Sequence, residues 1–477
     1  MSLVAPLSET KRRLLDSYLR QKLAKPVEAP AIPRRLSTGP APLALSQEQI
    51  LIREQVARGI PLYNESITLK FKCRMDPGIL QWSMAEVIRR HEIWRTNYDT
   101  VAGQFVQVVN AAPQRFELPF VDLRRGPEWQ RKADVRKLSL AQTTRPFDLR
   151  NGPLLRATLV AMADSEYWLV ITAHQSIVDG VSVYQLFPNE LFTIYQAFSL
   201  DLPCPFPELP LQFSDFACWQ RDYLSAAEEF RQIAYWRRQL AGAIPITCWP
   251  ARKLRPAERT FRGYIREFTM PRDIADAAAA LARSNGTTMF ALLMTTFFTL
   301  LRSYAGQDDL VVGTLSPAGR KRSETQALLG YFLNPVAIRV NMAGDPSFSE
   351  LLQRVQITVS EAISHDDVPF ERIVNALESP HDRSRNPYFD AALSLQPCMP
   401  DSGGLWSVTS MDAESGGSAL DLYVAFIDRP EGLHARVQYN PDVFDFEEMQ
   451  HMMDDFQALL SLAAARPQGR ISQLAPG

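Results

Sequence analysis

One short stretch of the chain gathers side chains that can carry protons or bind a developing negative charge. An apolar run ends in His174, Gln175 and Ser176, and Asp179 and Gly180 follow closely. A histidine, with a reference pKa of about 6.5, exchanges protons near neutral pH, whereas a glutamine amide only donates and accepts hydrogen bonds. Polar side chains in a loop on rigid elements often carry function. The alternative is an ordinary turn at a strand end, in which the histidine is only a hydrogen-bonded structural residue.

Motifs for several other chemistries are missing from the sequence. None of the six histidines forms an HExxH pair, and His91-Glu92 lacks the second histidine that a zinc protease needs. The chain has no GxSxG, no phosphate-binding P-loop and no GxGxxG that opens a helix after a strand. We therefore expect no metal site, and the hydrolase, nucleotide and dinucleotide classes have no motif in their favour.

Composition narrows the class further. The 477 residues carry 51 Lys+Arg against 53 Asp+Glu, so a net charge of −2 gives no reason to expect nucleic acid as a partner. The longest apolar helix candidate, residues 289–301, is interrupted by threonines and is shorter than the roughly 20 residues that a bilayer requires. The five cysteines are scattered without CxxC spacing, and no apolar run follows the N-terminal charges. We expect a cytoplasmic protein with reduced thiols and no membrane contact.

The turn must be held by elements that the hydrophobic pattern predicts around it. Strands are expected at 154–162 and 167–172, and a helix at 180–198 with a kink or break caused by Pro188. The other expected helices are 46–57, 77–91, 129–142, 274–284, 288–304, 347–362, 370–377 and 446–464, and the other expected strands are 65–71, 94–98, 105–109, 310–313, 336–340, 391–396, 420–427 and 433–439.

This alternation without strict βαβ spacing indicates a layered α/β fold with mixed sheets. Residues 1–42 are expected to form a short basic helix, at 8–23, and a proline-rich linker or docking segment. A second proline cluster at 203–210 marks the expected crossing between two lobes. The boundaries that follow are 43–205 for an N-terminal lobe with the turn and 206–477 for a C-terminal lobe.

Further motifs give the chain a resemblance to the condensation domains of nonribosomal peptide synthetases over residues 43–477. The matching segments occur in order along the chain: LSQEQ at 45–49, RHEIWRT at 90–96, FSDFACWQ at 213–220 with YW at 235–236, GQDD at 306–309 followed by Gly313 and AGR at 318–320, LGYFLN at 329–334, HDDVPF at 365–370 and RSRNP at 383–387. In this family the turn reads HHxxxDG, and here it reads HQxxxDG, with Gln175 in place of the second histidine.

The resemblance implies a chemistry and the roles of several residues. The family joins an acyl group, carried as a thioester on the phosphopantetheine of one carrier protein, to an amine on another carrier protein. His174, Gln175, Asp179 and Gly180 would form the catalytic turn, and because the second family histidine works at the reacting centre, Gln175 implies reduced activity. Loss of a general base typically costs about 10²–10⁴-fold in rate.

Further expectations concern structure and ligands. The resemblance implies two lobes, each like chloramphenicol acetyltransferase, arranged as a V around a central tunnel that contains the turn. Asp179 is expected to pair with Arg95 as a structural anchor, and Gly180 to allow close backbone approach or an unusual dihedral at the helix start. Ser176 and Asn334 are expected to contact substrate, with a core or loop role held equally open for Asn334.

No tightly bound cofactor is implied, because carrier proteins deliver the phosphopantetheine arms. The implied partners are the upstream and downstream carrier proteins and the neighbouring synthetase domains. The basic run of Arg252, Lys253, Arg255, Arg259 and Arg262 is either a solvated face or a site for an acidic carrier or a phosphate.

Two functions of different classes stay open. The chain is a slow or altered acyltransferase, or it is a condensation-like module that binds carriers or recruits a tailoring enzyme. Gln175 favours the second function and the other motifs favour the first. Gln175 could also be a deliberate replacement that traps a substrate complex. An epimerisation domain shares the turn, but the motifs outside it resemble those of condensation domains.

Overall fold

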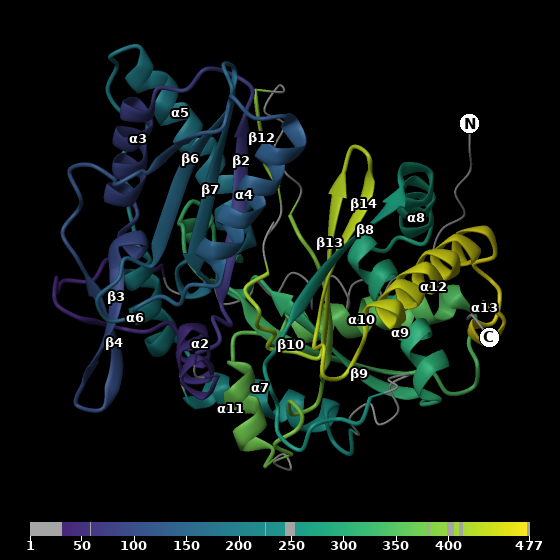
Figure 1. Cartoon of the computed structure of the whole chain (residues 1–477). Helices are drawn as coiled ribbons and strands as arrows, with labels where there is room; N and C mark the ends of the chain where they lie inside the picture. Colours follow the sequence, from purple (N-terminus) through teal and green to yellow (C-terminus); the bar gives the residue numbers. More distant parts are fainter. Residues whose placement is uncertain are drawn as a thin grey trace, which may run out of the picture.

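The structure is a computed structural model that describes residues 31–57, 59–224, 226–243, 253–378, 382–397, 405–409 and 414–474. The helix expected at 8–23 lies outside these residues. We call residues 31–224 the first half and residues 226–474 the second half. Figure 1 shows the halves side by side, each built around its own large sheet.

The first sheet is mixed and has five strands. Its order is β12 (Trp406–Thr409), β2 (Asn64–Phe71), β7 (Glu166–His174), β6 (Leu155–Ala163) and β5 (Phe120–Asp122), with only β5 and β6 parallel. Helices α3 (Pro77–Arg90) and α5 (Phe187–Ser199) pack on one face, and α4 (Glu128–Thr143) packs on the other.

Strand β7 shows why this sheet is buried on both faces. Side chains alternate along a strand, so Leu169 and Ile171 join the core below α3 and α5, while Trp168 and Val170 pack with α4. A strand that is apolar at every position has two covered faces. The strand ends at His174, where the polar residues begin.

The second sheet has six strands. Its order is β10 (Asn334–Asn341), β9 (Asp309–Ser316), β11 (Ala391–Leu395), β13 (Leu422–Arg429), β14 (Gly432–Tyr439) and β8 (Tyr264–Pro271), and β11 runs parallel to both of its neighbours. The helices α8 (Arg272–Ser284), α9 (Met289–Ala305), α10 (Phe348–Ile363) and α12 (Phe446–Ala465) share one large core with it.

Smaller elements complete the description. A three-stranded sheet joins β1 (Ala41–Pro42), β4 (Gln104–Val109) and β3 (Thr96–Val101), and the remaining helices are α2 (Leu45–Val56), α6 (Phe213–Tyr223), α7 (Ala226–Gln239), α11 (Phe370–Ala376) and α13 (Ile471–Leu474). At Pro188 the chain stays helical where we expected a kink or break, but the type of helix changes: a π-helix, Ser182–Leu186, precedes α5, and Pro188 lies in the first turn of α5. The π-helix continues into α5, because the N–H of Phe187 donates to the carbonyl of Ser182, and Pro188 has no N–H with which to extend this ladder.

The two sheets do not divide the sequence at the proline cluster. Strand β12 comes from the second half yet pairs with β2 of the first sheet. Leu328 and Phe332, also from the second half, belong to the core of the first. The expected boundary at 205/206 stays a prediction, but any such boundary is crossed twice by later residues.

An ion pair across the halves holds the turn after β7. The Asp179 carboxylate accepts hydrogen bonds from Nε and Nη2 of Arg320, at 2.7 and 2.8 Å, and from the backbone N–H of Ser182 at 2.8 Å. The side chain of Asp179 is 0% exposed and that of Arg320 is 5% exposed. Arg320 also donates to the carbonyls of Thr325 and Leu328, so both charges are fully used.

The expected partner of Asp179 was therefore wrong. Arg95 lies beside Glu92, with 3.6 Å between Nη2 and Oε1, and donates to the carbonyl oxygen of Asn110. Arg95 ends a short 3₁₀ turn, Glu92–Arg95, that leads into β3, whereas Asp179 faces the second half. The structural role that we assigned to Asp179 itself agrees with its burial.

The crowding around Gly313 of β9 gives a first testable prediction. A Cβ atom on Gly313 would lie 2.2 Å from Cε2 of Phe389, so we expect Gly313→Ala to destabilise the fold by about 1–3 kcal/mol, as overpacking does. Urea unfolding followed by circular dichroism measures the change. Gly126→Ala is the control, because the nearest atom to its Cβ is 3.7 Å away. Equal midpoints for the two variants would contradict the prediction.

The buried ion pair between Asp179 and Arg320 gives a second testable prediction. Removing one partner leaves a buried charge, so Asp179→Ala should lower the free energy of unfolding by about 3–5 kcal/mol. Asp164→Ala, which breaks an exposed contact with Arg124, should have little effect. Adding Arg320→Ala to Asp179→Ala should cost far less than Arg320→Ala alone, because the two residues act as a unit. Strictly additive losses would show that the pair is not the anchor.

Candidate functional site

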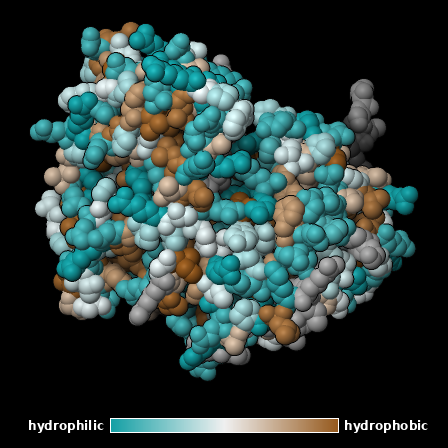
Figure 2. All heavy atoms as spheres, viewed as in Figure 1, coloured by the Kyte–Doolittle hydropathy of each residue, from teal (hydrophilic) through white to brown (hydrophobic). Residues whose placement is uncertain are grey.

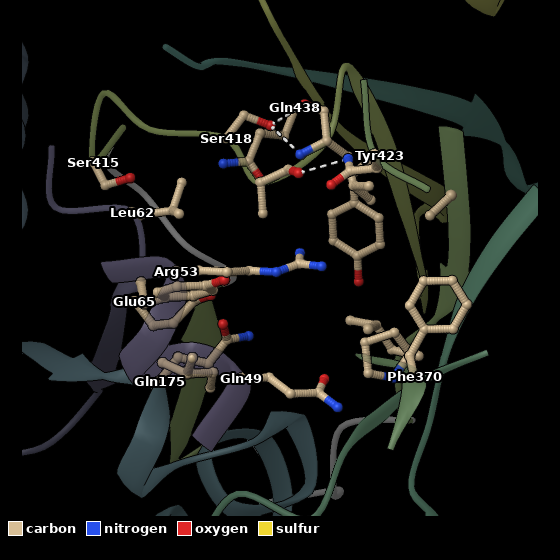
Figure 3. A pocket seen from close by; sticks show the side chains of 18 of the residues that line it. Gln49, Arg53, Leu62, Glu65, Gln175, Phe370, Ser415, Ser418, Tyr423 and Gln438 are labelled. Carbon is tan, nitrogen blue, oxygen red and sulfur yellow. Dashed lines mark hydrogen bonds between the residues drawn. The ribbon is translucent and has the colours of Figure 1, made fainter. Parts of the chain in front are cut away.

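A cavity of about 120 Å³ lies between the two sheets. Figure 2 shows mainly hydrophilic residues where the surface is hollowed between the halves. Residues of both halves line the cavity, and Figure 3 shows side chains that enter it from opposite sides. The polar lining residues used below are Gln49, Arg53, Tyr63, Glu65 and Gln175 from the first half, and Tyr423 and Arg436 from the second.

Gln175 is the residue of the turn that reaches this cavity. Its backbone N–H donates to the carbonyl of Tyr63 at 2.8 Å, and its own carbonyl accepts from Val178 at 3.2 Å. These bonds fix the short 3₁₀ turn Gln175–Ile177 at the end of β7. Among the described residues its side-chain amide has no hydrogen-bond partner, so it is available to a ligand.

His174 lies behind Gln175 and does not line the cavity. Its ring is 0% exposed and contacts the rings of Tyr63 and Phe147 edge-on. Nδ1 accepts a long hydrogen bond from the backbone N–H of Ser176, at 3.3 Å. Nε2 is 3.8 Å from Oε2 of Glu54, and neither atom has a hydrogen-bond partner among the described residues.

Two residues expected to contact substrate are placed elsewhere. Ser176 is 0% exposed, its Oγ lies 2.7 Å from Nδ1 of His174, and its carbonyl accepts from Nε2 of Gln47 at 2.9 Å. Asn334 donates to the carbonyls of Asp366 and Val368, at 2.7 and 2.8 Å, which fastens the 366–370 loop to the start of β10. The substrate contact expected of Ser176 is corrected to a structural role, and of the two roles held open for Asn334 the structure favours the loop role over the substrate contact, because these polar groups are already bonded inside the protein.

Gly180 is approached by side chains and not by the backbone that we expected. A Cβ atom there would lie 2.6 Å from Oε1 of Gln396, a residue that follows β11 of the second half. Its φ angle lies outside the left-handed region, so the unusual dihedral is not found, and the end of the Gln396 side chain can move aside, so neither backbone conformation nor space strictly requires glycine here.

The basic run that could have received an acidic partner is largely used inside the protein. Arg255 binds Asp421, Arg262 binds Asp442, and Arg259 donates to Asn386 and to a backbone carbonyl. Lys253 donates to two backbone carbonyls, and Arg252 lies outside the described residues. These contacts leave the run without a free cationic patch in the described part of the chain.

Several buried polar atoms that face this cavity lack partners in the described structure: Nε2 of Gln49, Oε2 of Glu65 and Nε of Arg436. Native proteins leave few such atoms unpaired, and those at a cavity commonly meet a ligand or water. Burial raises the pKa of Glu65 to about 7, although Arg436 opposes the shift. Burial also raises the pKa of Tyr63 to about 12. The cavity therefore holds one carboxyl group that titrates near neutral pH.

Sequence reasoning overlooked Glu65, although a signal was present. In β2, Ile67, Leu69 and Phe71 point into the core of the first half, while Ser66 and Lys70 face α4 and Trp168. Because side chains alternate along a strand, Glu65 belongs to the same face of β2 as these three apolar residues. A carboxylate at a core-facing position of an alternating strand is unusual enough to indicate a function or a buried partner.

Charges from the two halves also meet beside the cavity. Nε of Arg53, in α2, donates to Oε1 of Glu371, in α11, at 3.1 Å. Within the described ranges no cluster of three His, Cys, Asp or Glu residues could hold a metal ion. No single described helix is long and apolar enough to cross a membrane, although α8 and α9 together, bent by 105°, would pass on length and composition.

Known proteins show the same architecture. The X-domain from teicoplanin biosynthesis matches with a TM-score of 0.80 and 26% identity over 94% of this chain and 100% of that chain. The first condensation domain of the calcium-dependent antibiotic synthetase matches with a TM-score of 0.78 over 91% of this chain and 99% of that chain; at 18% identity this likeness shows the fold alone.

Sequence comparison extends the agreement. One component of the linear gramicidin synthase from Brevibacillus parabrevis is 35% identical over 438 residues, 91% of this chain and 6% of that protein. Phosphinothricin tripeptide synthetase PhsC from Streptomyces viridochromogenes is 32% identical over 475 residues, 99% of this chain and 43% of that protein. The chain thus spans less than half the length of these relatives. The family model of the condensation domain matches residues 38–475, and the chain belongs to the condensation domains of nonribosomal peptide synthetases.

Proposed function

We propose that the chain joins a carrier-bound acyl donor to a carrier-bound amine, at a reduced rate. Upstream and downstream carrier proteins would deliver the two substrates on phosphopantetheine arms, in the cytoplasm. The two halves would correspond to the two chloramphenicol acetyltransferase-like lobes, and the cavity to part of the tunnel between them. Neighbouring synthetase domains would supply the carriers.

The observation that carries this proposal is the position of Gln175. Its amide lines a cavity that both halves form, in the turn that Asp179 and Arg320 hold in place. Reacting groups from two carriers need such a shared space, because positioning them together supplies much of the rate.

The same residue explains why the rate is expected to be low. Forming the amide requires the amine to lose a proton as its nitrogen bonds to the thioester carbon. The Gln175 amide can orient the amine or donate to the oxyanion, but it cannot take the proton. His174 is enclosed behind the cavity wall and does not replace the missing histidine.

A binding module is the second candidate function. The X-domain from teicoplanin biosynthesis, in complex with OxyB, matches this chain with a TM-score of 0.78 and 26% identity. In that case the domain would present a surface to a tailoring enzyme and would form no amide. The presence of Gln175 favours this candidate, whereas the cavity that residues of both halves line favours condensation.

The exchange of Gln175 for histidine tests the proposal. We expect Gln175→His to raise single-turnover amide formation on the order of 10²-fold, because an imidazole at this position can accept the amine proton. Both proteins receive the same loaded donor and acceptor carriers, and product is measured by mass spectrometry.

Gln49→His is the matched control, because Gln49 also lines the cavity but lies outside the turn. It should give no comparable gain. If the chain forms no amide with either residue at position 175, the binding module is the better function. A wild-type rate equal to that of Gln175→His would mean that orientation by glutamine is sufficient.

A further inference from the structure

Glu65 is a carboxylate in a place that the strand pattern reserves for apolar side chains. Cross-strand pairing sets it opposite Ala173, one residue before the turn, and the backbone of Tyr63, two residues earlier, binds that of Gln175. Residues two apart on a strand share a face. Glu65 and Gln175 both line the cavity, and Figure 3 shows both entering it from the first half.

The surroundings of Glu65 compensate its charge only from a distance. Its Oε2 is buried without a hydrogen-bond partner, and no ion pair within 4.0 Å joins it to Arg436 in the described structure. Tyr184, which follows the turn, and Tyr423 of β13 are close enough for their pKa values to respond to Glu65. Arg53 and Tyr63 line the same cavity. Glu371, which forms an ion pair with Arg53, lies beside it. Among the described residues, Arg436 is therefore the one cation acting on Glu65, and it does so at a distance.

From this placement we infer that Glu65 is the catalytic base that accepts the amine proton in the chain with Gln175. The inference rests on the proposed condensation and names the group that carries its residual rate. As the amine nitrogen bonds to the thioester carbon, one N–H proton passes to the Glu65 carboxylate. The carbon–sulfur bond then breaks, its electron pair stays on sulfur, and the proton returns to give the free phosphopantetheine thiol. Atoms and charge balance without any further reactant.

The titration of Glu65 suits this task. A base works best when its pKa lies near the working pH, and an ordinary glutamate, at about 4.3, is too weakly basic for an amine. Burial brings the pKa of Glu65 to about 7. Arg436 keeps a fraction of the group charged at neutral pH, where an unaided buried carboxyl would stay protonated.

A structural explanation competes with this role. Glu65 and Arg436 could be a long-range charge pair whose purpose is to hold the two sheets together. The two roles predict opposite effects on stability, because a pair that stabilises the fold is lost on neutralisation, whereas an uncompensated buried charge opposes folding.

A double-mutant cycle between positions 65 and 175 tests the inference. We expect Glu65→Gln to slow single-turnover amide formation by about ten- to a hundredfold in the wild-type background. In the Gln175→His background, Glu65→Gln should lower the rate of amide formation by less than about threefold, because the imidazole then accepts the amine proton. Glu267→Gln, an exposed carboxylate paired in register with Arg436, is the control and should leave both rates unchanged.

Two further readouts separate catalysis from structure. The wild-type rate should rise with pH to an inflection near 7 that Glu65→Gln removes, which leaves only the titration of the acceptor amine at about 8. Since the pKa of Glu65 is raised on folding, its charged form opposes folding as the pH rises from about 4.5 to 7. Glu65→Gln should therefore raise the melting temperature at pH 8 and leave it unchanged near pH 4.5.

Each alternative result has a distinct meaning. Equal losses of rate in the two backgrounds, or a lower melting temperature for Glu65→Gln at pH 8, would overturn the assignment of Glu65 as the base. An unchanged pH profile would do the same. Absence of amide from every variant, Gln175→His included, would instead overturn the proposed condensation and the inference with it.

Discussion

The buried contact between Asp179 and Arg320 is the constraint on which the candidate site depends. Both charges lie out of water, and each is satisfied by several hydrogen bonds, so neither half provides the contact alone. Because the carboxylate is held in two directions, the turn has little freedom to rotate Gln175 out of the cavity. The geometry of the site is thus a property of the packed halves rather than of the turn sequence.

The cavity shows the opposite arrangement of polar groups. Asp179 and Asn334 have all their partners within the protein, whereas Gln49, Glu65 and Arg436 each keep an unpaired buried atom beside empty space. Buried polar groups with all their partners inside the protein fix the shape of the fold. Buried polar groups without partners lower the stability of the fold, but they are free to bind a ligand. Position in the fold, not residue type, decides to which kind a side chain belongs.

Local patterns predicted much of the fold, since strand alternation and helix end signals act over a few residues. The π-helix before Pro188 and the stop of α8 at Asn285 follow from such signals. The partner of Asp179 was missed because Arg320 is distant in sequence, and the motif with Arg95 was a nearer candidate. The sequence shows Glu65 as a charged residue on the apolar face of its strand. That this charge faces a cavity with Arg436 on its other side depends on the packing of the second sheet, which the sequence pattern does not show. Short strands such as β5 and β12 have too few residues for any periodicity to emerge.

Strand β12 also limits how one half of such a domain can be replaced by that of a relative. It forms the outer strand of the first sheet, beside β2, although it is encoded far downstream. A recombination joint near residue 205 would give β2 a border strand from a different parent, or none. An uncovered β2 would present free backbone amides and carbonyls to other chains, a frequent origin of aggregation. Successful grafts should therefore move both halves together, because the edge of one sheet is inherited with the other.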